Sequence, residues 1–374
     1  MQELQKLLEL SISASFMKIG IFDPYLDTLS GGEKYMLSAA LCLSQKHNVS
    51  LFWNIDKSGE IIHNAQRKFG IDLTRIQFKE NIFSSHVPLV IRLKESLDYD
   101  LIVYLSDGSI PTVLTSLILH FQTPIEWVNA TSIKSRIKIK RVKSIICNSK
   151  FTKGYIDNKF SVKSNVVYPP VTVHTEFLKN NKENVILNVG RLGIKSAGSS
   201  YKKQEVLVEV FKDMVRKGLR NWVFRLVVSV NDQDMDEFIN LKNQAKDFPV
   251  AFILNPDNKV LWENYNLSKI YWHAAGFGED LNKYPDRAEH FGISTVEAMG
   301  AGAVPVVINA GGQQEIVHEG LDGFLWNDEN ELINKTMILI KDEGLWEKLS
   351  SQSRIQSKLF SKDNFCRSLN SLIQ

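Results

Sequence analysis

The feature that most constrains the fold is a regular alternation of short apolar runs with longer stretches of helical periodicity. Such alternation predicts βαβ units, in which helices cover both faces of a parallel sheet. Ten runs are too many for one compact doubly wound sheet but suit two. The predicted strands are Ile19–Phe22, Val49–Trp53, Leu101–Leu105, Ile145–Cys147, Val166–Tyr168, Val185–Val189, Phe224–Val230, Ala251–Leu254, Ile270–His273 and Val304–Ile308, and helices are predicted at Gly32–Leu43 and Pro111–Leu119.

The length of 374 residues also indicates two domains, at roughly 100–200 residues each. Pro169 and Pro170 precede a charged, Asn-rich segment that is typical of a linker. We therefore expect a first domain over residues 17–175 and a second over residues 183–350. Residues 351–374 are expected to form a C-terminal helix, which either stays with the second domain or crosses back to the first. Residues 1–16 are interpreted as an optional extension, because the first convincing strand follows Met17.

Composition excludes several classes of protein. Hydrophobic residues at 44% and charged residues at 23% exclude a disordered or low-complexity chain. A net charge of +3 is too balanced for an obligate nucleic-acid binder, so no nucleic-acid partner is expected. Cys42, Cys147 and Cys366 lie far apart without CxxC spacing, which argues against a disulfide framework or a zinc site and favours a reducing cytosol. No apolar run approaches the roughly 18 residues that cross a bilayer, so a cytoplasmic protein is expected.

Glycine is concentrated in one part of the chain. Nine of the 21 glycines fall between Gly276 and Gly323, around a predicted turn, short helix, buried strand and second turn. The helix N-terminus near Ile293–Thr295 presents backbone N–H groups and a partial positive charge, which suit a phosphate. Glu289 and Glu297 flank this position, and carboxylates suit hydroxyl groups rather than phosphates. Hydroxyls on both sides of a diphosphate describe a nucleotide sugar.

A structural alternative exists for the second carboxylate. The spacing Ser294-x-x-Glu297 also matches a capping box, in which Glu297 accepts a hydrogen bond from the backbone of Ser294. On spacing alone, both interpretations stay open.

The whole run resembles a known family. Glu289-x7-Glu297, followed by EAMGAGAVPVV, AGGQQEIV and DGFLW, resembles the signature of retaining family-4 glycosyltransferases of GT-B fold, the glycosyl transferases group 1. The segment EHFGISTVEAMGAGAVPVV is similar to mannosyltransferases that act on lipid-linked oligosaccharides. The segments 22–33, 147–149, 167–170 and 188–191 match further elements of the family.

This resemblance implies an α/β fold of two Rossmann-like, doubly wound parallel-sheet domains that face each other across a cleft. It implies transfer of a hexose, with mannose as the leading choice, from a nucleotide sugar to a glycan or lipid-linked glycan with retention of configuration. The alternatives are a catalytically silent nucleotide-sugar-binding subunit and a GT-B phosphorylase or epimerase. A dehydrogenase is not expected, because no G-x-G-x-x-G follows the first strand.

The resemblance also implies residue roles. Arg191 and Lys202 would bind the diphosphate, with the adjacent Lys203 as an alternative to Lys202. Glu289 would accept hydrogen bonds from the donor sugar and Glu297 from the ribose. The catalytic set is Arg191, Lys202, Glu289 and His120, and the donor-binding set is Gly31, Gly32, Gly190, Lys203, Phe291, Gly292, Ile293, Ser294 and Glu297. Neither a metal nor another cofactor is expected, since the Asp98/Asp100, Asp232/Asp234 and Asp234/Asp236 pairs are interpreted as structural.

A cationic stretch suggests a second partner. Residues Lys134–Lys143 include six cations interleaved with Ile137 and Ile139. They either contact anionic lipid head groups or form a solvated face. With a lipid-linked acceptor, the protein would be peripheral to the inner face of a membrane.

Overall fold

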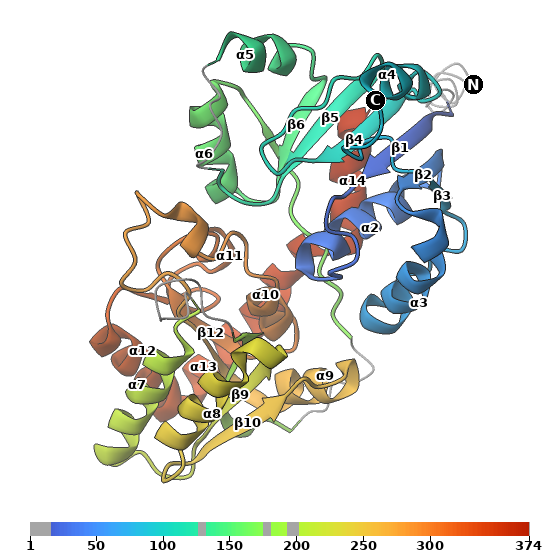
Figure 1. Cartoon of the computed structure of the whole chain (residues 1–374). Helices are drawn as coiled ribbons and strands as arrows, with labels where there is room; N and C mark the ends of the chain where they lie inside the picture. Colours follow the sequence, from blue (N-terminus) through green and yellow to red (C-terminus); the bar gives the residue numbers. More distant parts are fainter. Residues whose placement is uncertain (1–15, 126–131, 175–180, 193–201, 374) are drawn as a thin grey trace, which may run out of the picture. The chain divides into compact units, whose positions relative to one another are not determined.

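The structure is a computed structural model that describes residues 16–373 except 126–131, 175–180 and 193–201. The chain forms two compact units (Figure 1): unit 1 runs to Pro170 and resumes at Lys362, and unit 2 comprises Val171–Ser361. The chain therefore changes unit directly after the predicted Pro169-Pro170 junction. Residues 351–361, expected with the C-terminal helix, belong to unit 2 instead.

Unit 1 contains a seven-stranded parallel sheet in the order β3-β2-β1-β4-β5-β6-β7. Side chains alternate between its two faces along β4, since Leu101, Val103 and Leu105 join one apolar cluster and Ile102 and Tyr104 join the other. Helices cover both faces, as the alternation predicts. The strands are β1 (Lys18–Phe22), β2 (Asn48–Phe52), β3 (Gln77–Lys79), β4 (Leu101–Leu105), β5 (Ser116–Phe121), β6 (Ser144–Cys147) and β7 (Asn165–Val166), and the helices are α2 (Gly31–Leu43), α3 (Ser58–Phe69), α4 (Leu89–Ser96), α5 (Ile133–Ile139), α6 (Lys150–Phe160) and α14 (Lys362–Ile373).

One predicted helix of unit 1 is wrong. The segment Pro111–Leu119 was expected to be helical, but Ser116–Phe121 forms β5, which pairs with β4 and β6. A short apolar run has no periodicity that separates a buried strand from a buried helix. Parallel neighbours on both sides decide the outcome here.

Unit 2 contains a six-stranded parallel sheet in the order β10-β9-β8-β11-β12-β13. In its main apolar core, side chains from the sheet, including Phe224, Ile270 and Trp272, pack against side chains of α7, α8, α12 and α13. The strands are β8 (Glu183–Arg191), β9 (Val223–Ser229), β10 (Val250–Leu254), β11 (Ser268–His273), β12 (Val304–Ile308) and β13 (Phe324–Trp326), and the helices are α7 (Gln204–Arg216), α8 (Met235–Gln244), α9 (Asn258–Leu267), α10 (Ile293–Gly300), α11 (Gln313–Ile316), α12 (Glu329–Lys341) and α13 (Glu343–Ser357). Within the described ranges, no helix combines the length and apolar character that crossing a membrane requires.

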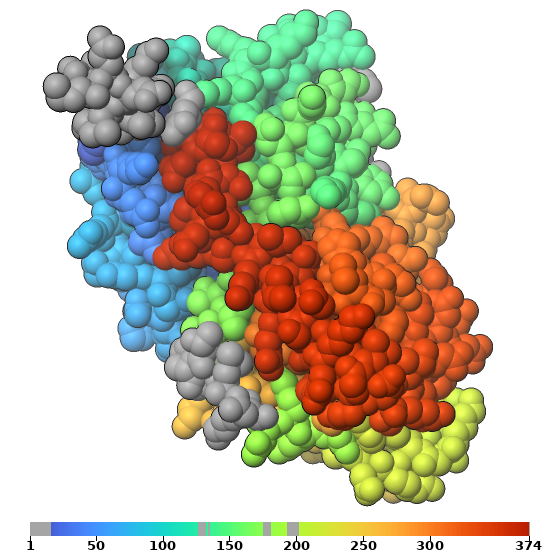
Figure 2. Space-filling view, turned by 180° about the vertical axis from the view of Figure 1, so that it is seen from behind, coloured from blue at the N-terminus to red at the C-terminus, as the bar shows by residue number. Residues whose placement is uncertain are grey.

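The last helix returns to unit 1, where α14 packs against α2 (Figure 2). Phe365, Leu369 and Ile373 of α14 are buried in the core cluster that α2 also lines. Cys42 of α2 and Cys366 of α14 form a disulfide with their Cα atoms 5.5 Å apart. The expectation that the cysteines are unpaired is therefore wrong for this pair. A separation of 324 residues hides the contact from sequence spacing.

Candidate active site

The candidate site of unit 2 lies where the strand order reverses. From β8 the chain proceeds to β9 and β10 on one side, while β11 begins the run to β12 and β13 on the other. In an open parallel sheet, this switch point opens a crevice outside the carboxyl ends of the strands. β8 ends at Arg191 and β11 at His273, so these two residues flank the crevice.

A carboxylate with two partners forms the centre of the site. The Nζ of Lys202 lies 2.6 Å from Oε2 of Glu289, and the Nε2 of His273 lies 3.0 Å from the same oxygen. Burial raises the pKa of Glu289, but the ammonium of Lys202 and the hydrogen bond from His273 outweigh it and hold the pKa well below its usual value. Oε1 accepts no hydrogen bond from the described residues, so an ionised oxygen is available to a ligand hydroxyl.

The proton on His273 can be assigned from its two neighbours. The backbone N–H of Ala275 donates to Nδ1 at 3.4 Å, so the ring proton lies on Nε2 and is donated to Glu289. Burial lowers the pKa of His273, which keeps the ring neutral. Sequence reasoning missed this residue. Its signal was a polar side chain at the last position of an apolar strand, at the edge where α/β sheets bind ligands.

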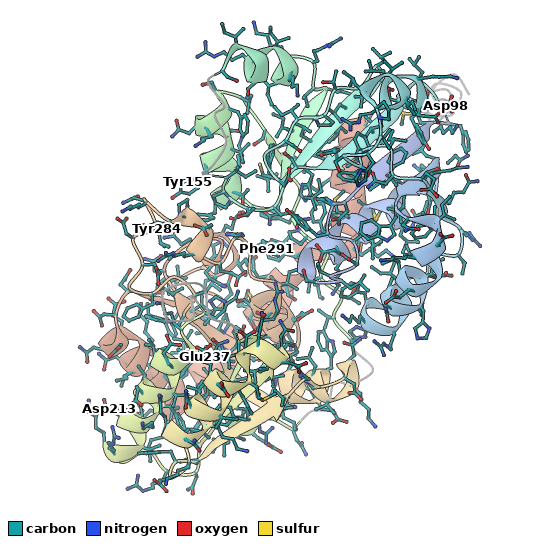
Figure 3. The ribbon with its side chains drawn as sticks, viewed as in Figure 1. Asp98, Tyr155, Asp213, Glu237, Tyr284 and Phe291 are labelled. Atoms are coloured by element: carbon teal, nitrogen blue, oxygen red, sulfur yellow. A yellow bond between two sulfur atoms is a disulfide. The ribbon has the colours of Figure 1, made fainter. Side chains whose placement is uncertain are left out.

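The two neighbouring lysines diverge. Whereas Lys202 contacts Glu289, Lys203 begins α7 in the left-handed region and places its Nζ 2.7 Å from Glu279. Glu279 also accepts from Arg287, whose guanidinium stacks 4.1 Å over the ring of Tyr284, a residue labelled in Figure 3. Lys203 is therefore engaged in an adjacent ionic network.

Arg191 is exposed at the end of β8, directly after Gly190. Its carbonyl accepts a hydrogen bond from the side chain of Gln204 at 3.2 Å. This bond fixes the strand end to the start of α7. Residues 193–201, which separate Arg191 from Lys202 in the chain, lie outside the described residues.

Glycine positions the N-terminus of α10 against Glu289. Gly292 precedes the helix with a φ of 117°, and a Cβ there would lie 2.8 Å from Nε2 of Gln313. The N–H of Gly312 donates to the carbonyl of Glu289 at 2.7 Å, and a Cβ on Gly311 would lie 2.4 Å from that oxygen. The two predicted glycine turns therefore pack on each other. The first N–H groups of α10, at Ile293 and Ser294, have no acceptor within the helix.

The second carboxylate takes a different partner from the one that a capping box requires. The hydroxyl of Tyr265 donates to Glu297 at 2.9 Å, and the hydroxyl of Tyr271 donates to Ser294 at 2.8 Å. Gly292, not Ser294, is the N-cap of α10. The capping-box alternative is therefore wrong, because the glycine turn starts the helix two residues before it. Phe291, labelled in Figure 3, is buried against Phe360, so only its backbone faces the turn.

The predicted residues of unit 1 lie at the carboxyl ends of its strands. Gly31 is the exposed first residue of α2, next to its cap Ser30. A Cβ on Gly32 would lie 2.3 Å from Gln122, whose amide donates to the Gly32 carbonyl at 3.0 Å. A side chain at position 32 would therefore displace the Gln122 amide and its hydrogen bond.

His120 is only 1% exposed on β5. Its ring stacks on Tyr35 with centroids 4.1 Å apart, and its Nδ1 lies 3.3 Å from the carbonyl of Ile146. Burial lowers the pKa of His120 to about 3. Its Nε2 has no hydrogen-bond partner among the described residues. The side chain is thus a neutral core group of unit 1.

Comparisons with known proteins agree with this geometry. Residues 172–356 match the family model "Glycosyl transferases group 1". An uncharacterized glycosyltransferase of Methanocaldococcus jannaschii is 27% identical over 68% of this chain and 65% of its own length. The GDP-Man:Man(3)GlcNAc(2)-PP-Dol alpha-1,2-mannosyltransferase of Dictyostelium discoideum is 25% identical over 60% of this chain and 45% of its own length. These matches span less than two thirds of either relative.

A solved structure shows the same fold. The Anabaena protein HepE in complex with UDP has a TM-score of 0.72 and 16% identity, covering 96% of this chain and 99% of that one. At this identity the likeness concerns the fold alone, namely a GT-B fold of two parallel-sheet Rossmann-like domains. Residues 172–356, which contain the Glu289 site, are thus similar to the glycosyl transferases group 1 family.

Proposed function

We propose that this protein is a glycosyltransferase that moves a hexose, with mannose as the leading candidate, from a nucleotide sugar to a glycan or lipid-linked glycan with retention. The observation that carries the proposal is Glu289, held ionised by Lys202 and His273 beside the N-terminus of α10. A carboxylate that can accept hydrogen bonds from sugar hydroxyls thus lies next to a helix N-terminus that can bind an anion. The UDP in the HepE structure and the GDP-mannose in the Dictyostelium relative's name support a nucleotide-sugar donor.

In the proposed reaction, the bond between the anomeric carbon and the diphosphate breaks and the leaving diphosphate gains negative charge. Arg191, Lys202 and the N–H groups of α10 stabilise that charge, because preorganised cations and dipoles act strongly where charge develops. Glu289 accepts hydrogen bonds from the sugar hydroxyls, and Glu297 accepts one from the ribose. In this proposal, Lys202 contacts both the carboxylate of Glu289 and a phosphate oxygen of the donor.

In the proposed reaction, unit 1 binds the acceptor. Gly31, exposed where α2 begins, allows close approach of a diphosphate to the backbone. His120 contributes through the end of β5 that its stacking on Tyr35 holds in place. The chain's own cations provide the charge stabilisation, so we expect turnover to be insensitive to EDTA.

Nucleotide binding tests the proposal. Thermal unfolding is followed with UDP, GDP, ADP and their sugars, because a ligand at 100 times its Kd stabilises by about 2.7 kcal/mol. One nucleotide is expected to raise the Tm by about 5–10 °C for a unit of this size. Arg191→Ala should reduce that shift only in part, because the cation acts mainly on the charge that develops in the transition state. If no nucleotide stabilises the protein, the proposal fails.

We also propose a cytoplasmic protein that associates peripherally with the inner face of a membrane through the cations of Lys134–Lys143. The balance of cations over acids in this segment supports contact with anionic lipid rather than a purely solvated face.

A further inference from the structure

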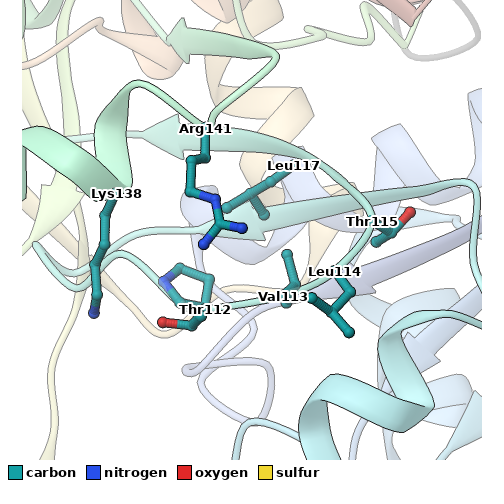
Figure 4. A pocket seen from close by; sticks show the side chains of 8 residues that line it. Thr112, Val113, Leu114, Thr115, Leu117, Lys138 and Arg141 are labelled. Carbon is teal, nitrogen blue, oxygen red and sulfur yellow. The ribbon is translucent and has the colours of Figure 1, made fainter.

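A small pocket lies beside the cationic helix α5, at the amino end of β5. The segment Pro111–Thr115 forms one wall, and the end of α5 with the following turn forms the other, around about 160 Å³ (Figure 4). Lys138 and Arg141 reach it from the helical side and Thr112 from the facing segment. This pocket is separate from the candidate active site, which lies at the carboxyl ends of the strands of unit 2.

The pocket has the chemistry of an anion site. The Nζ of Lys138 donates to the carbonyl of Ile110 at 2.9 Å, which fixes the ammonium at the rim while two of its protons remain for a ligand. Figure 4 shows the guanidinium of Arg141 pointing into the space above Thr112. A planar guanidinium and an ammonium both bind phosphate oxygens well. Between residues 109 and 143 the sequence has a single acidic residue, Glu126, which lies outside the described part.

Apolar side chains are exposed on the same segments. Leu114, which lines the pocket, is 52% exposed, and Ile133 and Ile137 of the adjoining helix α5 are 77% and 58% exposed. Single exposed aliphatic residues need no explanation. Here two of them alternate with cations along α5 and the third lines the pocket beside it, which is the composition of a membrane-interface surface. A nucleic acid would use the cations but would leave the aliphatic side chains without a partner.

We propose that this face of unit 1, defined by Lys138, Arg141, Ile133, Ile137 and Leu114, docks on a bilayer that contains anionic phospholipid. One headgroup phosphate occupies the pocket, and the three aliphatic side chains enter the boundary with the acyl chains. This deepens, and rests on, the membrane association proposed above. Docking at the amino end of β5 leaves the carboxyl ends of the sheet unobstructed, so the acceptor edge of unit 1 stays accessible.

Vesicle sedimentation tests the proposal with the full-length protein. Vesicles of phosphatidylcholine alone are compared with vesicles containing about 30% phosphatidylglycerol. We expect binding to the anionic vesicles, and a loss of about thirty-fold in the partition coefficient for Lys138→Gln/Arg141→Gln, from about 1 kcal/mol per cation. Ile133→Ser/Ile137→Ser should weaken binding comparably while leaving the net charge unchanged.

The matched control is Lys57→Gln/Arg67→Gln, which removes one lysine and one arginine from exposed positions elsewhere on unit 1. It should reduce binding by less than about three-fold. If the control lost as much vesicle binding as Lys138→Gln/Arg141→Gln, the proposed pocket would be overturned, because net charge alone would then explain the binding. Equal binding to neutral vesicles would also overturn it. The nucleotide-induced Tm shift, measured on the same variants, reports independently whether the proposed enzymatic function stands.

Discussion

At the scale of single residues, the candidate site depends on the two carboxylate oxygens of Glu289, which have different surroundings. Lys202 and His273 both contact Oε2 of Glu289, which leaves Oε1 available. The two partners of Glu289 are expected to have different roles. The ammonium of Lys202 can also stabilise the negative charge of a leaving diphosphate, whereas the neutral ring of His273 orients the carboxylate.

The cations are expected to act in the transition state. Arg191→Ala and Lys202→Ala should each lower kcat by about 10²–10³-fold with smaller effects on donor binding, because the diphosphate gains charge as the bond breaks. Arg191→Lys should rescue only partly, since an ammonium lacks the two-point contact of a guanidinium. Steady-state kinetics with the identified donor measure these effects. Lys203→Ala is the control and should be mild; a stronger loss there than in Lys202→Ala would reverse the two assignments.

His273 is expected to be a positioning residue. His273→Phe should raise the pKa of Glu289, since it removes a donor to the carboxylate, and should weaken donor binding about ten-fold, the effect of losing one such hydrogen bond. The acid limb of the kcat/KM profile should move to higher pH. His273→Gln keeps an N–H donor and should restore most of the affinity. An unchanged pH profile in His273→Phe would assign the histidine to packing alone.

Burial of His120 predicts a pH effect on stability. Its pKa is about 3 in the fold and 6.5 when unfolded, so the unfolded state binds more protons between these values and stability from this group falls as pH falls. Asp23, whose pKa burial and then the nearby Glu33 raise to about 7, has the opposite sign. The contributions of His120 and Asp23 must therefore be separated by mutation. Between pH 7 and pH 5, the free energy of unfolding of His120→Phe, measured with urea, should rise by about 2 kcal/mol relative to that of the wild type.

Asp23→Asn is the opposite-sign control for that experiment. The asparagine variant should be relatively more stable at pH 8 than at pH 5, because it lacks the buried carboxyl that must ionise as pH rises. Parallel pH profiles for wild type and His120→Phe would show that His120 is accessible to protons in the folded state.

At the scale of elements, the geometry of the site depends on how α10 begins. Gly292 provides a φ that other residues rarely adopt, and the turn at Gly311 and Gly312 packs on the backbone of Glu289. The helix N-terminus and the carboxylate are thus held by the same two turns. A change in either turn should therefore affect nucleotide binding and stability together.

Gly292→Ala tests this coupling. The strained φ and the contact of 2.8 Å with Gln313 should destabilise unit 2 by about 1–3 kcal/mol and weaken nucleotide binding. Gly344→Ala in α13, where a Cβ would meet an ordinary contact at 3.5 Å, should be neutral or slightly stabilising. Thermal unfolding with and without nucleotide distinguishes them. Normal stability and binding in Gly292→Ala would contradict the role of the turn.

At the scale of the whole molecule, the C-terminal helix α14 packs on α2 of unit 1 and is linked to it by a disulfide. Removing the disulfide by Cys42→Ser/Cys366→Ser should lower the stability of unit 1 by about 2–4 kcal/mol, as is typical for a bridge that closes a long loop. It should also increase the rate at which a protease cleaves α14, without releasing the helix from unit 1. Dithiothreitol should destabilise wild type but not the double variant. In a reducing cytosol, the apolar contacts of Phe365, Leu369 and Ile373 would hold α14 without the bridge.

The sequence by itself determined the two doubly wound sheets and the turn–helix–strand–turn unit around Glu289 and Glu297. These follow from local periodicity and from glycines that only certain turns accept. Tertiary structure alone decided that Ser116–Phe121 is a strand, that Cys42 meets Cys366, that His273 orients Glu289 and that Lys202 and Lys203 diverge. Each of these depends on contacts between residues distant in the chain, and short runs or single side chains carry no periodic signal of their spatial neighbours.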